Sequence, residues 1–145
     1  MAAALFNALA RRAGEDDTLV AQSAGTWALE NNTASAHAIT VMAERGIDIS
    51  DHRGRTITRE LMAEAAAVIV MERSHLEALA AEFPAYRKKI HLMSELNERT
   101  FDITDPYGGT LPEYQCCAQE LENLIVSGYK KIKLWITENE QSNFS

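Results

Sequence analysis

Apolar residues recur along this chain at helical spacing in several segments, and polar stretches separate these segments. Gly14, Gly46 and Pro84 each follow one of the segments, at the place where a helix commonly ends. Thr58 precedes another segment and can cap its first turn. The pattern therefore predicts helices over residues 2–13, 34–45, 58–65 and 73–82, and a last helix that begins near Pro112 and runs past Ile125.

Short apolar runs lie between these helices and predict buried strands. The clearest run, residues 66–71, is continuous and rich in β-branched residues, which is typical of a strand buried on both faces of a parallel sheet. Residues 19–24, which end at Gly25, and residues 89–93 have the same character, whereas residues 97–111 are irregular. Because helices and strands alternate in this order, we expect an α/β layered fold with a mainly parallel sheet.

The stretch Lys131–Ile136 admits two interpretations. It begins with a strand-like alternation, yet Gly128, Ile132 and Trp135 also continue the spacing of the preceding helix. Continuation of the helix is the favoured interpretation, and an added strand is the alternative.

Composition excludes several classes of protein. The 145 residues are 46% apolar and 24% charged, which is typical of one globular domain. No apolar run approaches the roughly 20 residues that a membrane span needs, so we expect no membrane partner. The net charge of −7 argues against nonspecific binding of nucleic acid, which requires clustered basic residues. A few local donors can still form an anion site in such a chain.

The only cysteines are the neighbours Cys116 and Cys117, which do not make a disulfide framework. A reducing, cytoplasmic compartment fits this usage best. No cluster of Cys and His has zinc spacing, so we expect neither a metal nor another cofactor. The opening residues 1–6 lack a basic region and have only a short apolar stretch, so no signal peptide is predicted.

Asp105-Pro106-Tyr107-Gly108-Gly109 is the most specific stretch of the sequence. Pro106 fixes one dihedral and the glycines permit left-handed geometry, so the loop is tightly shaped. A carboxylic acid beside a phenol suits proton donation to a leaving phenolate or amine. The alternative interpretation is a plain turn in which Tyr107 covers the core.

This loop occurs together with other motifs in a recognisable order. They are Ser23-Ala-Gly-Thr26 with Trp27, Gly46-Ile-Asp-Ile49 followed by His52-Arg53-Gly54-Arg55, Val70-Met71-Glu72, Phe83-Pro84, and Tyr114 and Cys117 in the final helix. In this order and spacing, from Met1 to about Ile132, the chain resembles the low-molecular-weight protein tyrosine phosphatases.

The resemblance implies a flavodoxin-like, three-layer α/β fold around a parallel sheet. In that family the first, central strand ends in a phosphate loop, Cys-x5-Arg-Ser-Pro, which precedes a helix that residues 1–6 match. No Cys-x5-Arg occurs in the 145 residues, so the first strand, the nucleophile and the phosphate-binding Arg are expected to be missing. We therefore expect an N-terminally truncated phosphatase-like domain over residues 1–132 and a C-terminal tail over residues 133–145.

The resemblance also implies roles for individual residues. Asp105 matches the general acid, Tyr107 matches an aromatic wall that binds the substrate, and His52 matches a buried residue that supports the phosphate loop. A core or helix-start histidine is the alternative for His52. Arg53 and Arg55 are interpreted as solvated arginines rather than an anion patch. The cysteines are interpreted as packing residues because no Cys-x5-Arg spacing surrounds them.

These expectations leave alternative functions open. A complete member would hydrolyse a phosphorylated protein or a small phosphomonoester, and this chain as written is expected to be inactive because of a late start at Met1 or a shortened sequence. The alternatives are a non-catalytic pseudophosphatase that binds or regulates, and an unrelated activity on the same fold. An in-frame Cys-x5-Arg-Ser-Pro upstream of Met1 would separate the first two. Preference for phosphotyrosine, phosphoarginine or arsenate is not set by these residues.

The missing strand also bears on association. Unpaired edges near residues 19–24 and 67–71 invite pairing with another chain. We therefore expect a homodimer or larger species, and the residues expected near its contact are Leu5, Leu9, Ile132 and Trp135. The alternative is that Lys131–Ile136 fills the gap as a replacement strand.

Overall fold

The computed structural model describes residues 1–25, 33–99 and 101–142. The described chain forms two compact units, Met1–Thr56 with Asp105–Val126, and Ile57–Thr104 with Ser127–Ser145. The long last helix, α5 (Leu111–Ser142), contributes its first half to the first unit and its second half to the second. Among the described residues, no helix is both long and apolar enough to cross a membrane.

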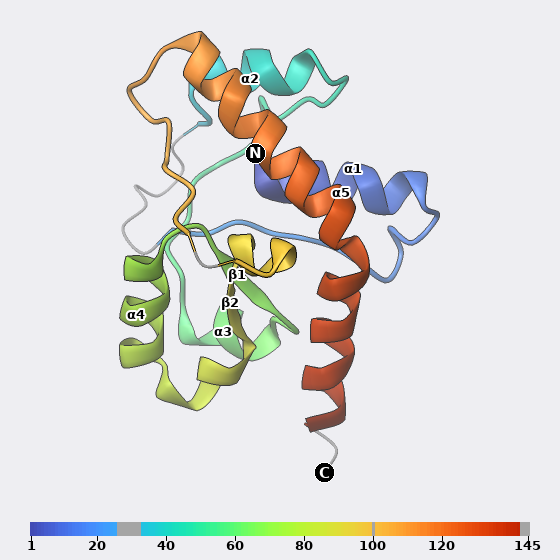
Figure 1. The fold of residues 1–145 in the computed structure, drawn as a ribbon, viewed down its shortest axis with the longest axis vertical. Helices are drawn as coiled ribbons and strands as arrows, with labels where there is room; N and C mark the ends of the chain where they lie inside the picture. The colour runs from blue at the N-terminus through green and yellow to red at the C-terminus, as the bar shows by residue number, and fades with distance from the viewer. Residues whose placement is uncertain (26–32, 100, 143–145) are drawn as a thin grey trace. The chain divides into compact units, whose positions relative to one another are not determined.

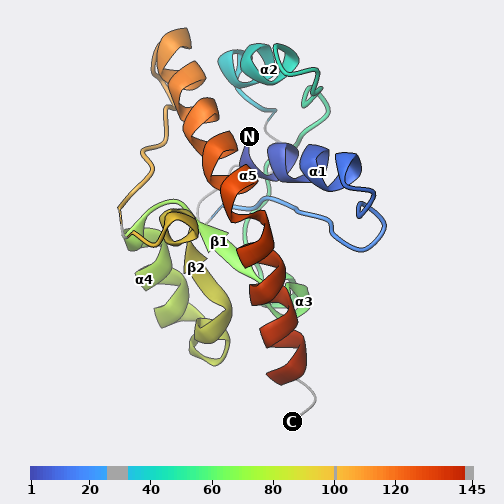
Figure 2. The same cartoon turned by 45° about the vertical axis from the view of Figure 1, so that its right-hand side comes forward.

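The first unit consists of helices and extended segments. It contains α1 (Ala2–Arg12), α2 (Ala36–Ala43) and the first half of α5, which Figures 1 and 2 show beside α2 with α1 below them. Arg45 Nε donates to Glu122 Oε2 over 2.6 Å and so links the end of α2 to α5. Buried residues of the three helices include Ala10, Met42 and Ile125. The predicted helices over 2–13 and 34–45 are confirmed.

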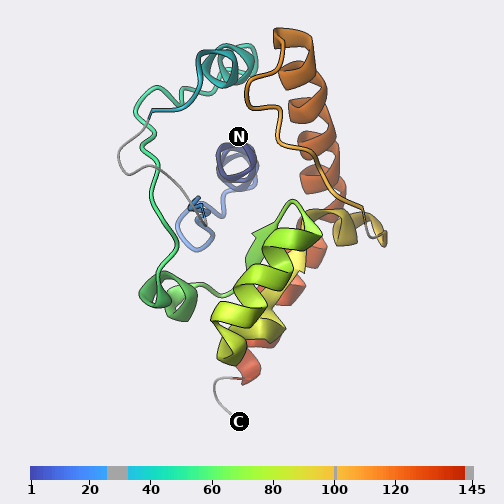
Figure 3. The ribbon, with the colours of Figure 1, turned by 90° about the vertical axis from the view of Figure 1, so that its left-hand side faces the viewer.

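The second unit carries the sheet. Strands β1 (Val68–Val70) and β2 (Ile90–Leu92) pair in parallel, with Val68 opposite Ile90. Helix α4 (Arg73–Glu82) connects them, and Figures 1 and 3 show α4 on one side of the strand pair and the second half of α5 on the other. The core joins both strands to α4 and to α3 (Arg59–Glu64), through residues Met62, Val70, Leu79, Phe83, Ile90 and Leu92. The parallel sheet predicted from 66–71 and 89–93 is confirmed.

Short 3-10 helices flank β2 and were not predicted. They are η1 (Pro84–Lys89) and η2 (Met93–Asn97). The second half of α5 packs against this region, because the Trp135 ring stacks on His91 with centroids 3.9 Å apart. Lys131 Nζ also donates to the backbone oxygen of Glu95 over 2.8 Å.

Helix α5 continues without a break through the tail as far as Ser142. The favoured prediction of a continued helix is therefore confirmed, and the alternative of a strand over Lys131–Ile136 is wrong. The expected boundary between residues 132 and 133 falls inside this helix.

The strand predicted over residues 19–24 is wrong. The segment is extended, but it forms no ladder with another described strand, and only an isolated bridge pairs Gly25 with Thr56. Its backbone is held by side chains instead, since Asn7 hydrogen-bonds both backbone groups of Ala21. An apolar run becomes a strand only where another backbone supplies a partner for its N–H and C=O groups.

The residues expected near a dimer contact also need correction. Leu5, Ile132 and Trp135 are buried within the chain, and Leu9 is partly buried. The apolar surfaces of Leu5, Ile132 and Trp135 are covered by the chain's own packing and are not available to a second copy, whereas Leu9 is partly exposed. Self-association itself stays a prediction.

Candidate functional site

A cleft of about 290 Å³ lies within the first unit and brings the predicted site residues together. Its walls come from the starts of α1 and α2, from two connecting segments and from the loop before α5. The lining residues are Met1, Ala3, Ala4, Ser23, Thr33, Ala34, Ser35, Ala38, Ile49, His52, Asp105, Pro106, Tyr107 and Tyr114. Asp105, Tyr107 and His52, which lie far apart in sequence, thus share one cavity.

Asp105 opens a tight turn whose backbone fixes its carboxylate. Asp105 Oδ1 accepts from the backbone N–H of Tyr107 over 3.0 Å, and Gly109 N donates to Pro106 O over 2.7 Å. Within the described residues, Asp105 Oδ2 accepts no hydrogen bond, and the residue is exposed. One carboxylate oxygen is therefore anchored and the other can meet a ligand in the cleft.

The glycines of this loop serve different purposes. Gly108 has a φ of 78°, which a residue with a side chain rarely adopts. At Gly109, an added Cβ would lie 2.8 Å from Pro106 O and would overlap the Glu113 carboxylate. Glu113 in turn accepts from Thr110 N over 3.3 Å and its own N–H donates to Thr110 Oγ1 over 3.4 Å, which is a capping box at the start of α5. The loop is thereby tied to the helix that follows it.

Tyr107 extends from the loop into solvent at the rim of the cleft. It is 82% exposed, so the alternative interpretation, in which this ring covers the core, is wrong. An exposed aromatic face beside a carboxylate offers a flat apolar surface to a ligand.

His52 lies in the cleft wall but differs from the expectation. It is exposed and ends a turn in which its backbone N–H donates to Ile49 O over 3.0 Å. It is thus neither a buried residue nor the first residue of a helix. Partial burial lowers the pKa of its imidazole, and the charges of the amino terminus, Arg55 and Arg53 lower that pKa further. The neutral imidazole is therefore favoured.

Arg53 and Arg55 bind the chain itself. Arg53 Nη1 donates to the backbone oxygens of Ser50 and His52, and Arg55 Nε donates to Ser23 O over 3.0 Å. Arg53 is exposed, in agreement with the interpretation of a solvated arginine, whereas Arg55 is partly buried and binds a segment distant in sequence. Sequence patterns do not reveal such contacts, because the carbonyl acceptors have no residue signature.

Neither cysteine has the surroundings of a nucleophile. Burial, together with the nearby Glu120 charge, raises the pKa of the Cys117 thiol, so the unreactive thiol is favoured. Cys117 is partly buried, as a packing residue would be, but Cys116 is exposed and the packing interpretation is wrong for it.

Helix starts are the part of the cleft that sequence reasoning did not anticipate. Met1, Ala3 and Ala4 place the first turn of α1 at the cavity, and Ser35, the N-cap of α2, lies beside it. The first turn of a helix leaves N–H groups without helix partners and carries partial positive charge. Ser35 before an apolar periodic segment was a readable signal for the second of these starts. The cleft therefore favours an anion.

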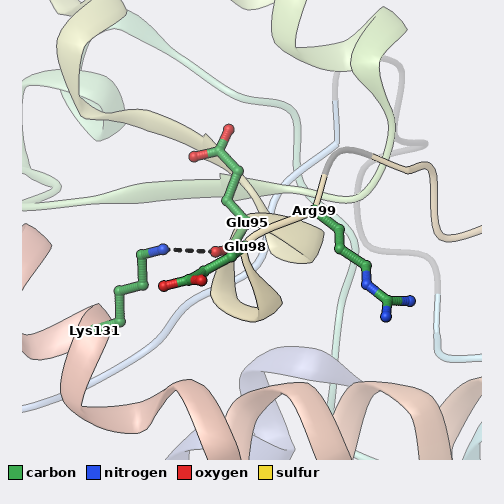
Figure 4. Close-up of a pocket in the computed structure, with 4 residues that line it drawn as sticks. All are labelled: Glu95, Glu98, Arg99 and Lys131. Carbon is green, nitrogen blue, oxygen red and sulfur yellow. Dashed lines mark hydrogen bonds between the residues drawn. The ribbon is translucent and has the colours of Figure 1, made fainter.

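A second cavity of about 330 Å³ lies in the other unit and is shown in Figure 4. Glu95, Glu98, Arg99 and Lys131 line it. Lys131 already donates to Glu95 O, and in Figure 4 the charged ends of Glu95, Glu98 and Arg99 point in different directions. Because these groups do not converge on one point, the cleft around Asp105 is the stronger candidate.

Two motif residues, Thr26 and Trp27, lie outside the described residues. Among the described residues, no group of His, Cys, Asp and Glu could hold a metal ion.

Comparison with known proteins gives concordant matches. Residues 1–134 match the family described as "Low molecular weight phosphotyrosine protein phosphatase". A protein-arginine-phosphatase of Bacillus subtilis (strain 168) is 34% identical over 134 residues, which cover 92% of this chain and 87% of that protein. A putative low molecular weight protein-tyrosine-phosphatase of Klebsiella pneumoniae is 38% identical over 111 residues, which cover 77% of this chain and 76% of that protein.

Solved structures agree with the sequence matches. The crystal structure of a low molecular weight protein tyrosine phosphatase from T. tengcongensis has a TM-score of 0.84 at 38% identity, covering 90% of this chain and 88% of that one. The predicted α/β fold class is thereby confirmed.

Proposed function

We propose that this chain, which belongs to the low molecular weight phosphotyrosine protein phosphatase family, contributes part of a protein phosphatase site. That part donates the proton to the leaving group and contacts the substrate. Its substrate in the complete enzyme would be a phosphorylated protein or a small phosphomonoester. The observation that carries the proposal is the meeting of Asp105, Tyr107 and His52 in one cleft that two helix starts also line.

Asp105 is proposed as the general acid. Its Oδ1 is held by the Tyr107 N–H, so Oδ2 can give a proton to the leaving oxygen or nitrogen as the bond to phosphorus breaks. The helix starts of α1 and α2 favour the negative charge of the phosphoryl group in the same cavity. A fixed acid next to an anion-favouring wall is the arrangement that phosphomonoester cleavage needs on its leaving-group side.

Tyr107 and His52 are proposed as supporting residues of this site. The exposed ring of Tyr107 offers a face on which the side chain that bears the phosphate can pack. His52, held largely neutral, can donate or accept one hydrogen bond at the cleft wall and is proposed to support a phosphate-binding loop. The relatives named above are a protein-arginine-phosphatase and a putative protein-tyrosine-phosphatase, so phosphoarginine and phosphotyrosine are the two substrate side chains to compare.

The 145 residues contain no Cys-x5-Arg, so we propose that this chain alone does not turn over phosphomonoesters. A covalent step requires an activated nucleophile, and the raised pKa of Cys117 argues against that thiol. The alternative proposal is a pseudophosphatase that binds phosphorylated partners without cleaving them.

The test begins with the chain as it stands and p-nitrophenyl phosphate as substrate. We expect no turnover, and no change on Cys116→Ser or Cys117→Ser substitution. Addition of a family-type first strand and phosphate loop before Met1 should then create a phosphatase. Turnover by the 145 residues that disappears with either Cys substitution would contradict the assignment.

The sequence upstream of Met1 separates the two candidate functions. An in-frame Cys-x5-Arg-Ser-Pro there supports the phosphatase, whereas its absence, together with binding of a phosphotyrosine or phosphoarginine peptide by the chain, supports the pseudophosphatase.

A further inference from the structure

Ser23 lines the cleft, although no strand ladder among the described residues holds its segment, residues 21–25. Asn7, on α1, takes the place of a neighbouring strand. Its Nδ2 donates to Ala21 O over 2.9 Å and its Oδ1 accepts from Ala21 N over 2.7 Å. A side-chain amide offers the same donor and acceptor pair as a peptide group, so Asn7 satisfies both backbone groups of Ala21.

Arg55 holds the same segment from a second direction. Its Nε donates to Ser23 O over 3.0 Å, and its Nη2 donates to Gln22 Oε1 over 2.8 Å. The backbone oxygen of Arg55 accepts from Gly25 N over 2.9 Å. The planar guanidinium presents several donors in a fixed geometry, which suits two acceptors on neighbouring residues.

We propose that Asn7 and Arg55 are positioning residues that join three walls of the cleft. Asn7 ties residues 21–25 to α1, whose first turn lines the cavity, and Arg55 ties them to the segment that carries His52. Ser23 lies between the two attachment points and is itself a lining residue. The effect on catalysis rests on the proposed function, whereas the positioning itself does not.

The hydrogen bonds of Asn7 and Arg55 hold residues 21–25 in place, because apolar packing contributes little to this segment. Val20 is 67% exposed, and residues 22–24 are also exposed. A segment that buries so little apolar surface gains little from the hydrophobic effect. Loss of its hydrogen bonds should therefore release it locally, without unfolding the helices on either side.

Hydrogen exchange in the 145-residue chain, followed residue by residue by NMR, tests the proposal. Asn7→Leu should speed exchange at the Ala21 N–H by about tenfold or more, because it removes both hydrogen bonds at similar side-chain volume. Asn7→Asp keeps an acceptor for that N–H and should preserve most of the protection. If the two variants behave alike, residue 7 acts through packing and the proposal is wrong.

Arg55 has a parallel test at Gly25. Arg55→Gln should speed exchange at the Gly25 N–H and raise the pKa of His52, because a positive charge beside the imidazole is removed. Arg11→Gln is the matched control, since Arg11 is exposed at the end of α1 and its side chain makes no hydrogen bond among the described residues.

Reference amides separate local release from general destabilisation. The N–H of Ile39 in α2 and that of Phe83 after α4 donate to Ser35 O and Leu79 O. Their exchange should stay unchanged in Asn7→Leu and Arg55→Gln. Equal acceleration at all these amides would mean global destabilisation and would overturn the proposal.

In the loop-bearing enzyme, Asn7→Leu should raise KM for aryl phosphates while the dependence of kcat on the leaving group stays as it was. Asp105→Asn should change that dependence instead. If Asp105→Asn has no effect but the exchange results hold, the proposed function fails and the positioning role stands. If only the exchange results fail, the positioning role is wrong and the acid assignment is unaffected.

Discussion

Two extended parts of this molecule are held in different ways. In the second unit, β1 and β2 pair backbone to backbone, and α3 and α4 cover them with apolar side chains. In the first unit, residues 21–25 are held by the amide of Asn7 and the guanidinium of Arg55. Leu92 in β2 is 3% exposed, whereas Val20 beside the second segment is 67% exposed.

This difference in how the two segments are held indicates that one mainly stabilises the fold and the other mainly shapes the site. A buried strand pair gains from the hydrophobic effect and from a regular ladder, so its position is maintained by many contacts. The exposed segment depends on a few polar contacts whose net contribution is only about 0.5–1.5 kcal/mol each. We infer that the strand pair contributes most to folding and that the segment mainly shapes the cleft.

The largest expected effect is on the free energy of unfolding, compared between one substitution in each region. Leu92→Ala should lower the free energy of unfolding by about 2–5 kcal/mol, because it opens a cavity between the strands and the helices. Val20→Ala removes a mostly exposed side chain and should change that free energy by no more than about 0.5 kcal/mol. Urea denaturation of the two variants measures both values, and equal losses would contradict the contrast.

A smaller effect tests how closely α5 packs in the second unit. A Cβ added at Gly128 would lie 2.6 Å from the Cβ of Leu96, which is buried and cannot move aside cheaply. The overlap costs about 1–3 kcal/mol, which exceeds the gain of about 0.5–1 kcal/mol from replacing a helical glycine by alanine. Gly128→Ala should therefore destabilise the protein.

Lys130→Ala is the matched control for Gly128→Ala, since Lys130 is exposed on the same helix two residues further along the chain.

The smallest expected effect is a pH dependence from His91, which stacks on Trp135 and lies 3.7 Å from Glu95. Burial lowers the pKa of His91 below its ordinary value of about 6.5, although Glu95 and Glu138 act in the opposite direction and Lys131 adds to the lowering. The unfolded chain therefore binds the proton more readily, so stability is full above that ordinary value and falls as the pH drops through the lowered pKa.

His91→Gln should weaken this loss of stability between neutral and mildly acidic pH, as followed by thermal unfolding. His52 is exposed, so its lowered pKa should contribute less, and His52→Gln should leave most of the pH dependence in place. The reverse ranking would show that the acid-sensitive group lies in the cleft unit.

The same contrast explains how much of the fold was readable from the sequence. Apolar runs and caps located α1 to α5 and both strands, and Thr58 indeed caps α3 by accepting from Leu61 N over 3.2 Å. Residues 19–24 have the same apolar character, but the sequence does not state whether a backbone partner lies beside them. The run was therefore mistaken for a strand.

The candidate site was readable to a similar degree. Proline and glycine around Asp105 and Tyr107 indicated a shaped loop, because these residues restrict or extend the backbone in known ways. The hydrogen bonds of Asn7 and Arg55 could not be predicted from the sequence. Asn7 binds backbone groups, and Arg55 binds a backbone oxygen and a side-chain amide oxygen. Contacts of that kind depend on tertiary geometry rather than on a motif.

The central claim is that Asp105 donates the proton to the leaving group, and the most direct measurement compares leaving groups in the loop-bearing enzyme. Turnover of p-nitrophenyl phosphate, whose phenolate leaves readily, is compared with that of phenyl phosphate, whose phenolate needs a proton. Asp105→Asn should slow phenyl phosphate by about 10²–10⁴-fold and p-nitrophenyl phosphate much less. Equal losses for both substrates, or none, would contradict the assignment of Asp105 as the general acid.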